Sequence, residues 1–228
     1  RGCLAQLKDE IGTLGCKKAL VVSDKFLTEN GGVEKVTKVL DQVGIEHTLY
    51  NDVKQNPSVA NVEGGLEVLK KENCDFIVSI GGGSPQDCGK AISVLATNGG
   101  KITDYEGVNK SQKKCLPIVA IATTAGTSAE VTINYVITDE EKKRKFVCVD
   151  PHDIPVIAVI DPEMMSSMPK GLTAATGMDA LTHAMEAVVA NGAIDVTDAT
   201  ALYAIKQIFE YLPRAVENGQ DIEAREQM

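Results

Sequence analysis

The first eighty residues alternate between two hydrophobic patterns. Continuous, β-branched apolar runs at residues 18–23 and 75–80 are typical of buried parallel strands, and residues 46–50 form another predicted strand between them. Apolar positions that recur every three or four residues predict helices over residues 4–14, 33–43 and 58–72. Ser58, at the start of the last of these helices, is a candidate N-cap. This alternation predicts an open parallel sheet with helices on both faces, which binds ligands at the carboxyl ends of its strands.

The pattern of the chain changes near Pro169. Before it, further strands are predicted at residues 116–122, 132–138, 145–149 and 156–160. The middle two of these alternate in polarity around a charged turn, which predicts a hairpin. After it, only helical periodicity remains, over residues 172–190 and 197–212. We therefore predict an α/β fold, with a parallel-sheet domain over residues 1–168 followed by a truncated, all-helical domain over residues 169–228.

Composition narrows the class of protein. The 23 Lys and Arg against 32 Asp and Glu give a net charge of −9, and no basic cluster interleaves with aromatics. Nucleic acid and anionic membranes are therefore not expected partners. No apolar run approaches the roughly 20 residues of a membrane span, and the first residues do not show the pattern of a signal peptide. The chain begins at Arg1 without Met and ends at Met228 inside a helical pattern, so we expect a fragment.

The cysteines predict the redox compartment. They occur singly, without the CxxC pairs of a metal or redox motif and without the density of a disulfide scaffold. We therefore expect reduced, mostly buried thiols and a cytoplasmic protein. The residues are Cys3, Cys16, Cys74, Cys88, Cys115 and Cys148.

The third strand runs directly into a glycine-rich turn, GGGSPQD, at residues 81–87. Ser84 is predicted as the N-cap of the following helix and Pro85 as its first helical residue. Glycines allow a phosphate to approach the backbone, and the helix N-terminus presents unpaired N–H groups to it. A plain tight turn is the alternative. Because GxGxxG is absent after the first strand, any dinucleotide must be held in a topology other than the usual one.

A second polar segment, TTAGTSAE at residues 123–130, follows the fourth strand. Small hydroxyl groups at the carboxyl end of a strand can donate hydrogen bonds to a ligand's pyrophosphate or ribose. The alternative is that they cap a helix.

The predicted helix at residues 173–189 carries Asp179 and His183 four positions apart. Side chains at this spacing lie one above the other, so a carboxylate oxygen and an imidazole nitrogen can converge on one divalent cation. A solvated ion pair is the alternative. The segment is apolar around most of its circumference, which predicts burial on several sides and favours the metal, because a buried carboxylate needs a partner.

Three motifs give the sequence a resemblance to the iron-dependent (group III) alcohol dehydrogenases. They are the glycine-rich turn, the segment TTAGTSAEVTINYVITDEEKKRKFVCVDPHDIP at residues 123–155, and AATGMDALTHA at residues 174–184. The first and third are specific for the family as a whole. The middle one is most similar to the members that reduce lactaldehyde.

The resemblance implies a cofactor site for NAD(H). It assigns the pyrophosphate to Gly83, Ser84, Pro85, Gln86 and Asp87, and the nicotinamide half to Thr123, Thr124 and Thr127, with Thr132, Asn134 and Lys145 nearby. Asp24 corresponds to the acidic residue that faces the adenosine ribose, and Asn56 to an asparagine on the adenosine side. Since a carboxylate accepts from the 2′-hydroxyl and repels a 2′-phosphate, we expect NAD(H) over NADP(H).

The resemblance also implies Fe²⁺ held by one Asp and three His. Asp179 and His183 match the first two ligands, and the other two are expected beyond residue 228. His47 and His152 are not ligands in the family. Zn²⁺ is less favoured than Fe²⁺, because the zinc-dependent relative that oxidises glycerol usually has Lys where Ser84 stands.

The implied activity is the NADH-dependent, reversible reduction of lactaldehyde to 1,2-propanediol, with Fe²⁺ as Lewis acid and no catalytic side chain beyond the metal site. The alternative substrates are 1,3-propanediol and other short-chain primary alcohols. A non-enzyme alternative is an inactive nucleotide-binding fragment, and we expect residues 1–228 alone to be inactive. The whole protein is expected to be a homodimer.

Overall fold

The computed structural model describes residues 1–228, which separate into two compact units. The sheet unit comprises Gly2–Ala122 and Ala129–Ile160, and the helical unit comprises Arg1, Thr123–Ser128 and Asp161–Met228. The predicted boundary at residue 168 remains a prediction, because the units are interleaved along the chain.

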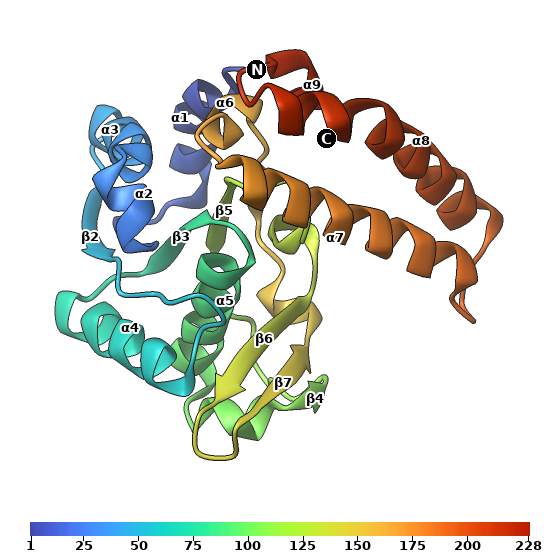
Figure 1. The fold of residues 1–228 in the computed structure, drawn as a ribbon. Coiled ribbons are helices and arrows are strands. Elements are labelled where there is room, and N and C mark those ends of the chain that lie inside the picture. Colours follow the sequence, from blue (N-terminus) through green and yellow to red (C-terminus); the bar gives the residue numbers. More distant parts are fainter. The chain divides into compact units, whose positions relative to one another are not determined.

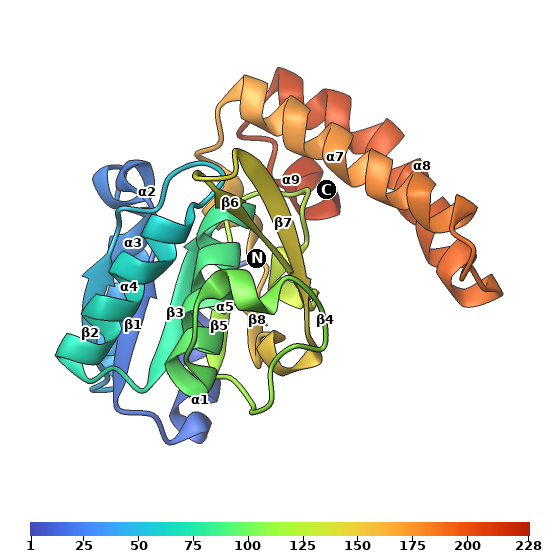
Figure 2. The ribbon, with the colours of Figure 1, turned by 90° about the horizontal axis from the view of Figure 1, so that it is seen from below.

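A five-stranded parallel sheet forms the centre of the sheet unit, in the order β2-β1-β3-β5-β8 (Figure 2). The strands are β1 (Lys18–Val22), β2 (Glu46–Tyr50), β3 (Phe76–Gly81), β5 (Ile118–Ala122) and β8 (Ile157–Val159). All six residues of β3 are buried, which is why its sequence is continuously apolar rather than alternating. The predicted α/β fold is confirmed.

Helices cover both faces of this sheet. The helices α1 (Leu7–Ile11) and α3 (Gly32–Gln42) lie on one face, and α4 (Val59–Glu72) and α5 (Gly83–Asn98) lie on the other (Figure 1). Ser58 caps α4 as predicted, since its side chain accepts from the N–H of Asn61 while the Asn61 side chain accepts from the Ser58 N–H. The capping box fixes where α4 begins.

Two local predictions were wrong. Residues 4–14 do not form one helix: the 3₁₀ turns Cys3–Gln6 and Gly12–Leu14 flank the five-residue α1. Ser84 is not the N-cap of α5, because the helix begins at Gly83 and Gly82 is the cap. Proline is tolerated anywhere in the first turn, where N–H groups have no intrahelical partner, so Pro85 did not fix the starting residue. The short elements α2 (Lys25–Glu29) and β4 (Gly107–Val108) were not predicted.

The predicted hairpin is present as β6 (Asn134–Asp139) and β7 (Arg144–Val149), in a three-stranded sheet of order β4-β7-β6. Arg144 donates two hydrogen bonds of 2.6 Å to the carboxylate of Glu106, next to β4. At the hairpin turn, the Asp139 carboxylate accepts from the Lys142 N–H at 3.0 Å. Both contacts thus lie at the turn end of the hairpin, where Arg144 begins β7 and pairs with Asp139.

The helical unit contains α6 (Pro162–Met165), α7 (Lys170–Val189), α8 (Asp195–Glu217) and α9 (Ile222–Gln227). Close packing of α7 on α8 depends on Gly177, where a Cβ would lie 2.2 Å from Leu212 Cδ1. The guanidinium of buried Arg225 donates to Thr173 Oγ1 at 2.8 Å, so α9 is tied to the start of α7. No helix of the chain combines the length and the apolar character needed to cross a bilayer.

All six cysteines are free, and Cys74, Cys88, Cys115 and Cys148 are buried, which agrees with the expectation of mostly buried thiols.

Candidate functional site

The glycine-rich turn joins β3 to the N-terminus of α5. Gly81 has φ +154°, and a Cβ on it would lie 2.4 Å from Pro85 Cγ, so only glycine fits. No side chain caps the helix at Gly82. The first N–H groups of this 16-residue helix therefore lack a capping side chain at the carboxyl end of the sheet. This is the geometry that suits a phosphate.

The side chains of Gln86 and Asp87 are engaged within the fold. Gln86 is 1% exposed; its amide donates to the Ile121 carbonyl at 3.1 Å and accepts from the Ser79 hydroxyl. Asp87 accepts from the Val136 N–H at 3.1 Å, and burial raises the pKa of its carboxyl group to about 7. These two predicted cofactor residues thus tie α5 to the sheet and to β6, and any contact they make with a cofactor must use other atoms.

Two predicted cofactor residues from distant segments, Ser84 and Lys145, meet at a third, Asn56. Its backbone N–H donates to Ser84 Oγ at 3.1 Å, and its side-chain oxygen accepts from Lys145 Nζ at 2.8 Å. The Asn56 carbonyl accepts from Thr138 Oγ1 at 3.2 Å. Asn56 has φ +57°, a left-handed conformation that asparagine tolerates better than most residues. The loop after β2 is thereby joined to α5 and to both strands of the hairpin.

Asp24 follows β1 directly and has a structural task of its own. It is the N-cap of α2, where its Oδ1 accepts from the Leu27 N–H at 2.8 Å. The sequence contains the signal for this cap, an aspartate before KFLTE, although only the ribose contact was predicted. A second carboxylate oxygen remains for a ligand.

Lys90, which was not among the predicted site residues, contacts two of them. Its Nζ donates to the carbonyl oxygen of Thr132 at 2.6 Å and to that of Asn134 at 2.9 Å, with Thr132 Oγ1 at 3.3 Å. Lys90 is completely buried. A lone lysine in the otherwise apolar stretch CGKAISVLA was the available signal, because a buried charge needs specific partners.

In the helical unit, the threonine-rich segment Thr123–Ser128 packs on α7. A Cβ on Gly126 would lie 2.6 Å from the carbonyl oxygen of Thr176, so the two backbones approach too closely for any other residue. Thr176 stands one turn before Asp179. The predicted nicotinamide residues Thr123, Thr124 and Thr127 are thus carried by a segment that touches the predicted metal-binding helix.

Asp179 and His183 point toward each other on α7, with Oδ1 and Nε2 3.7 Å apart. Two atoms that each lie about 2.1 Å from one cation are roughly 3–4 Å apart, so this spacing suits two adjacent ligands. The prediction that the helix is buried on several sides was wrong. The two side chains are 43% and 53% exposed, and only Thr173, Gly177 and Ala184 of α7 are buried. Some apolar side chains of α7 therefore remain exposed in residues 1–228.

No group of three or more His, Cys, Asp or Glu side chains in residues 1–228 is arranged to hold a metal ion. His47 lies beside Asp41 at 3.6 Å, and His152 lies between Ser111 and Asp150. The hydroxyl of Ser111 and the carboxylate of Asp150 both approach His152 Nδ1, so this trio lacks the relay geometry of a hydrolase triad.

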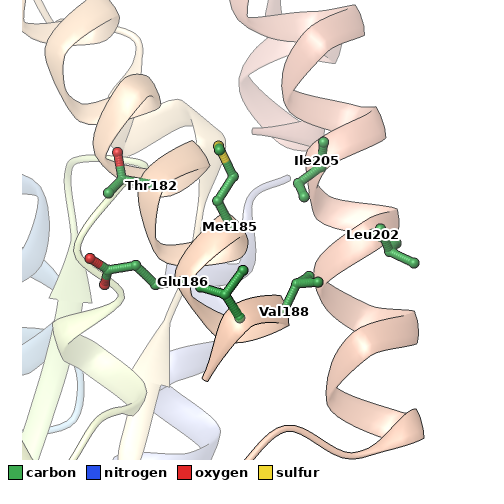
Figure 3. Close-up of a pocket in the computed structure, with 7 residues that line it drawn as sticks. Thr182, Met185, Glu186, Val188, Leu202 and Ile205 are labelled. Atoms are coloured by element: carbon green, nitrogen blue, oxygen red, sulfur yellow. The ribbon is translucent and has the colours of Figure 1, made fainter. Parts of the chain in front are cut away.

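An apolar groove of about 460 Å³ lies between α7 and α8. Thr182, Met185, Glu186 and Val188 line it from α7, and Leu202 and Ile205 line it from α8 (Figure 3). It contains none of the predicted cofactor or metal residues.

Two family descriptions match the chain. "Iron-containing alcohol dehydrogenase" matches residues 1–162, and "Fe-containing alcohol dehydrogenase family, C-terminal" matches residues 173–228. Among solved structures, a 1,3-propanediol oxidoreductase has a TM-score of 0.96 at 45% identity, covering 99% of this chain and 59% of that one. A sulfoacetaldehyde reductase from Bifidobacterium kashiwanohense in complex with NAD⁺ has a TM-score of 0.94 at 35% identity, covering 100% of this chain and 60% of that one.

Curated relatives agree. NAD-dependent methanol dehydrogenase of Bacillus methanolicus is 50% identical over 100% of this chain and 60% of its own length. Lactaldehyde reductase of Escherichia coli K12 is 49% identical over 97% of this chain and 58% of its own length. Alcohol dehydrogenase 4 of Schizosaccharomyces pombe is 51% identical over 100% of this chain and 54% of its own length. The chain thus spans little more than half the length of these relatives, and it belongs to the iron-containing alcohol dehydrogenase family.

Proposed function

We propose that the protein is an NAD-linked, iron-dependent oxidoreductase that reversibly reduces lactaldehyde to 1,2-propanediol. The observation that carries the oxidoreductase assignment is the family match over both parts of the chain. Lactaldehyde is favoured by the motif at residues 123–155. Overall identity does not separate this substrate from others, because lactaldehyde reductase of E. coli and 1,3-propanediol dehydrogenase of Klebsiella pneumoniae are 49% and 47% identical to the chain. 1,3-Propanediol and other short-chain primary alcohols are therefore the alternative substrates.

The residues of the chain suit this chemistry in three places. The first N–H groups of α5, at Gly83 and Ser84, have no side-chain cap and would bind a pyrophosphate, and Asp24 would accept from a ribose hydroxyl. Asp179 and His183 would hold one side of the metal, at a spacing that suits adjacent ligands. When bound, Fe²⁺ supplies Lewis acidity toward the substrate oxygen and nicotinamide supplies the hydride.

Because residues 1–228 contribute only this pair, we propose that they bind NAD(H) without turning over substrate. Two further ligands have to come from sequence of the kind that the longer relatives contain. We also propose that the whole protein is a cytoplasmic homodimer that acts on a small aldehyde.

A chimera tests the activity. Residues 1–228 would replace the corresponding segment of E. coli lactaldehyde reductase, whose remaining segment completes the protein. We expect iron-dependent oxidation of L-1,2-propanediol with NAD⁺, at a higher kcat/KM than for 1,3-propanediol or ethanol, while calorimetry on residues 1–228 alone gives NAD⁺ binding without turnover. A preference for 1,3-propanediol in the chimera, with the parent enzyme as control, would defeat the substrate assignment.

Replacing Asp24 by Asn should relax cofactor selection. Asparagine is as good an N-cap as aspartate, so α2 is retained while the negative charge that repels a 2′-phosphate is lost. We expect the ratio of NADP⁺ to NAD⁺ affinity to rise by about tenfold, the size of one charge interaction of roughly 1.4 kcal/mol. Calorimetry with both cofactors measures this ratio. An unchanged ratio would remove Asp24 from the ribose site, and Asp52→Asn, at an exposed carboxylate paired with Lys25, is the matched control.

A further inference from the structure

The ammonium group of Lys90 is buried inside the sheet unit, two helical turns after Gly83, where α5 begins. The side chain is fully buried, yet its three N–H donors have two carbonyl oxygens and one hydroxyl within 3.3 Å. A buried ammonium is costly unless such partners surround it. The contacts therefore reflect a specific arrangement and not a solvated surface charge.

These contacts fix a short piece of backbone. The carbonyl groups of Thr132 and Asn134 both accept from Lys90, and the carbonyl group of Ile133, between them, accepts from the Asp150 N–H at 2.9 Å. Three consecutive carbonyl groups are thus held at the place where the chain leaves the threonine-rich segment and its 3₁₀ turn (Ala129–Val131) and enters β6. We name residues 132–134 the lead-in segment.

Buried carboxylates surround this ammonium. Asp153 is fully buried, and neither of its carboxylate oxygens has a hydrogen-bond partner. The carboxylate of Asp153 attracts the ammonium group of Lys90, and the carboxylates of Asp87 and Glu130 attract it as well. Burial lowers the pKa of Lys90 and raises that of Asp153 to about 7. Lys90 thus has two separable roles, as counter-charge to Asp153 and as hydrogen-bond donor to the lead-in segment.

We propose that Lys90 is a positioning residue, which holds the lead-in segment in the conformation that binds NAD(H) by donating hydrogen bonds to the Thr132 and Asn134 carbonyl groups. The inference rests on the proposed function, since Thr132 and Asn134 are predicted cofactor residues. Lys90 itself does not contact the cofactor, because its donors are all used inside the fold and the side chain is not exposed.

Two variants of residues 1–228 separate the two roles. Lys90→Met removes donors and charge together, and it strands the carboxylate of Asp153, so this variant is expected to be unstable or to misfold. The double variant Lys90→Met/Asp153→Asn removes both charges of the pair and still lacks the donors. Asp153→Asn alone keeps the donors and is the matched control.

We expect the double variant to melt at a higher temperature than Lys90→Met, and yet to bind NAD⁺ roughly tenfold more weakly than the wild type, the effect of losing charge-assisted hydrogen bonds. Asp153→Asn should bind NAD⁺ within about twofold of the wild type. Wild-type NAD⁺ affinity in the double variant would overturn the proposal, since a lysine that served only as counter-charge would be dispensable once Asp153 is neutral.

Hydrogen exchange without cofactor tests the positioning apart from the proposed function. In the double variant, the amides of residues 132–136 and of Asp150 should exchange faster than in Asp153→Asn, with unchanged exchange in β1 and β3. Equal exchange in the two variants would also overturn the proposal. If the wild-type chain shows the expected protection but binds no NAD⁺, the proposed function fails, and the cofactor role of Lys90 fails with it.

Discussion

Replacing Asp179 or His183 by Ala should lower kcat/KM of the lactaldehyde reductase chimera by about 10³-fold or more, because a Lewis acid contributes several kcal/mol to the barrier. The two side chains face each other at 3.7 Å on one face of α7, and either substitution leaves a single ligand on that helix. Iron content after anaerobic purification should fall together with activity. Steady-state rates and elemental analysis measure the two effects.

The control for these variants lies on the same helix. Glu186→Gln removes an exposed carboxylate one turn after His183, at the edge of the groove between α7 and α8, and should leave iron content and rate within about twofold of the unsubstituted chimera. A folding defect would not explain a loss of activity in these variants, because Asp179 and His183 are exposed and substitutions of exposed residues usually change stability little. Full activity with iron retained in either alanine variant would remove α7 from the metal site.

Replacing Gly81 by Ala should lower the free energy of unfolding of residues 1–228 by about 2–4 kcal/mol, because two costs add. The residue has φ +154°, which a side chain makes unfavourable. A Cβ would also approach Cγ, Cβ and Cδ of Pro85 at 2.4, 2.9 and 3.0 Å, and a proline ring cannot swing away. Urea denaturation of the wild type and the variant measures the difference.

Substitutions at two other glycines separate the cost of backbone strain from the cost of the steric contact with Pro85. Gly99 has φ +73° and open space around it, so Gly99→Ala tests backbone strain alone and should cost about 1 kcal/mol. Gly12 has a negative φ and equally open space, so Gly12→Ala should be neutral or stabilise by less than about 1 kcal/mol. A loss at Gly81 no larger than at Gly99 would show that the Pro85 ring accommodates the methyl group.

The strands could be predicted because a buried parallel strand is apolar along its whole length, as in β3, and this signal is local. The start of α5 could not, because Ser84 was available both as a cap and as an acceptor. Its hydroxyl accepts from Asn56, 28 residues away, and no local pattern encodes that contact.

The candidate site shows the same limit. The spacing of Asp179 and His183 correctly predicted that they converge, since helix geometry alone decides it. Their burial was predicted wrongly, because an apolar helix surface indicates that a partner is needed and does not show that residues 1–228 contain one. The cofactor assignments stay predictions. The structure adds two findings. Asn56, Ser84 and Lys145 form one hydrogen-bond network, and Lys90 donates hydrogen bonds to the carbonyl groups of Thr132 and Asn134.

The placement of Thr123–Ser128 in the helical unit has a consequence for biosynthesis. On the ribosome this segment emerges directly after β5, whereas the surface of α7 on which Gly126 packs is made only after β6, β7 and β8. During that interval the loop has no α7 surface to pack on, and it lies between β5 of the five-stranded sheet and β6 of the three-stranded sheet. A shorter chain that ended before α7 would never make the surface on which this loop packs. We therefore expect the two units to fold poorly when they are expressed separately.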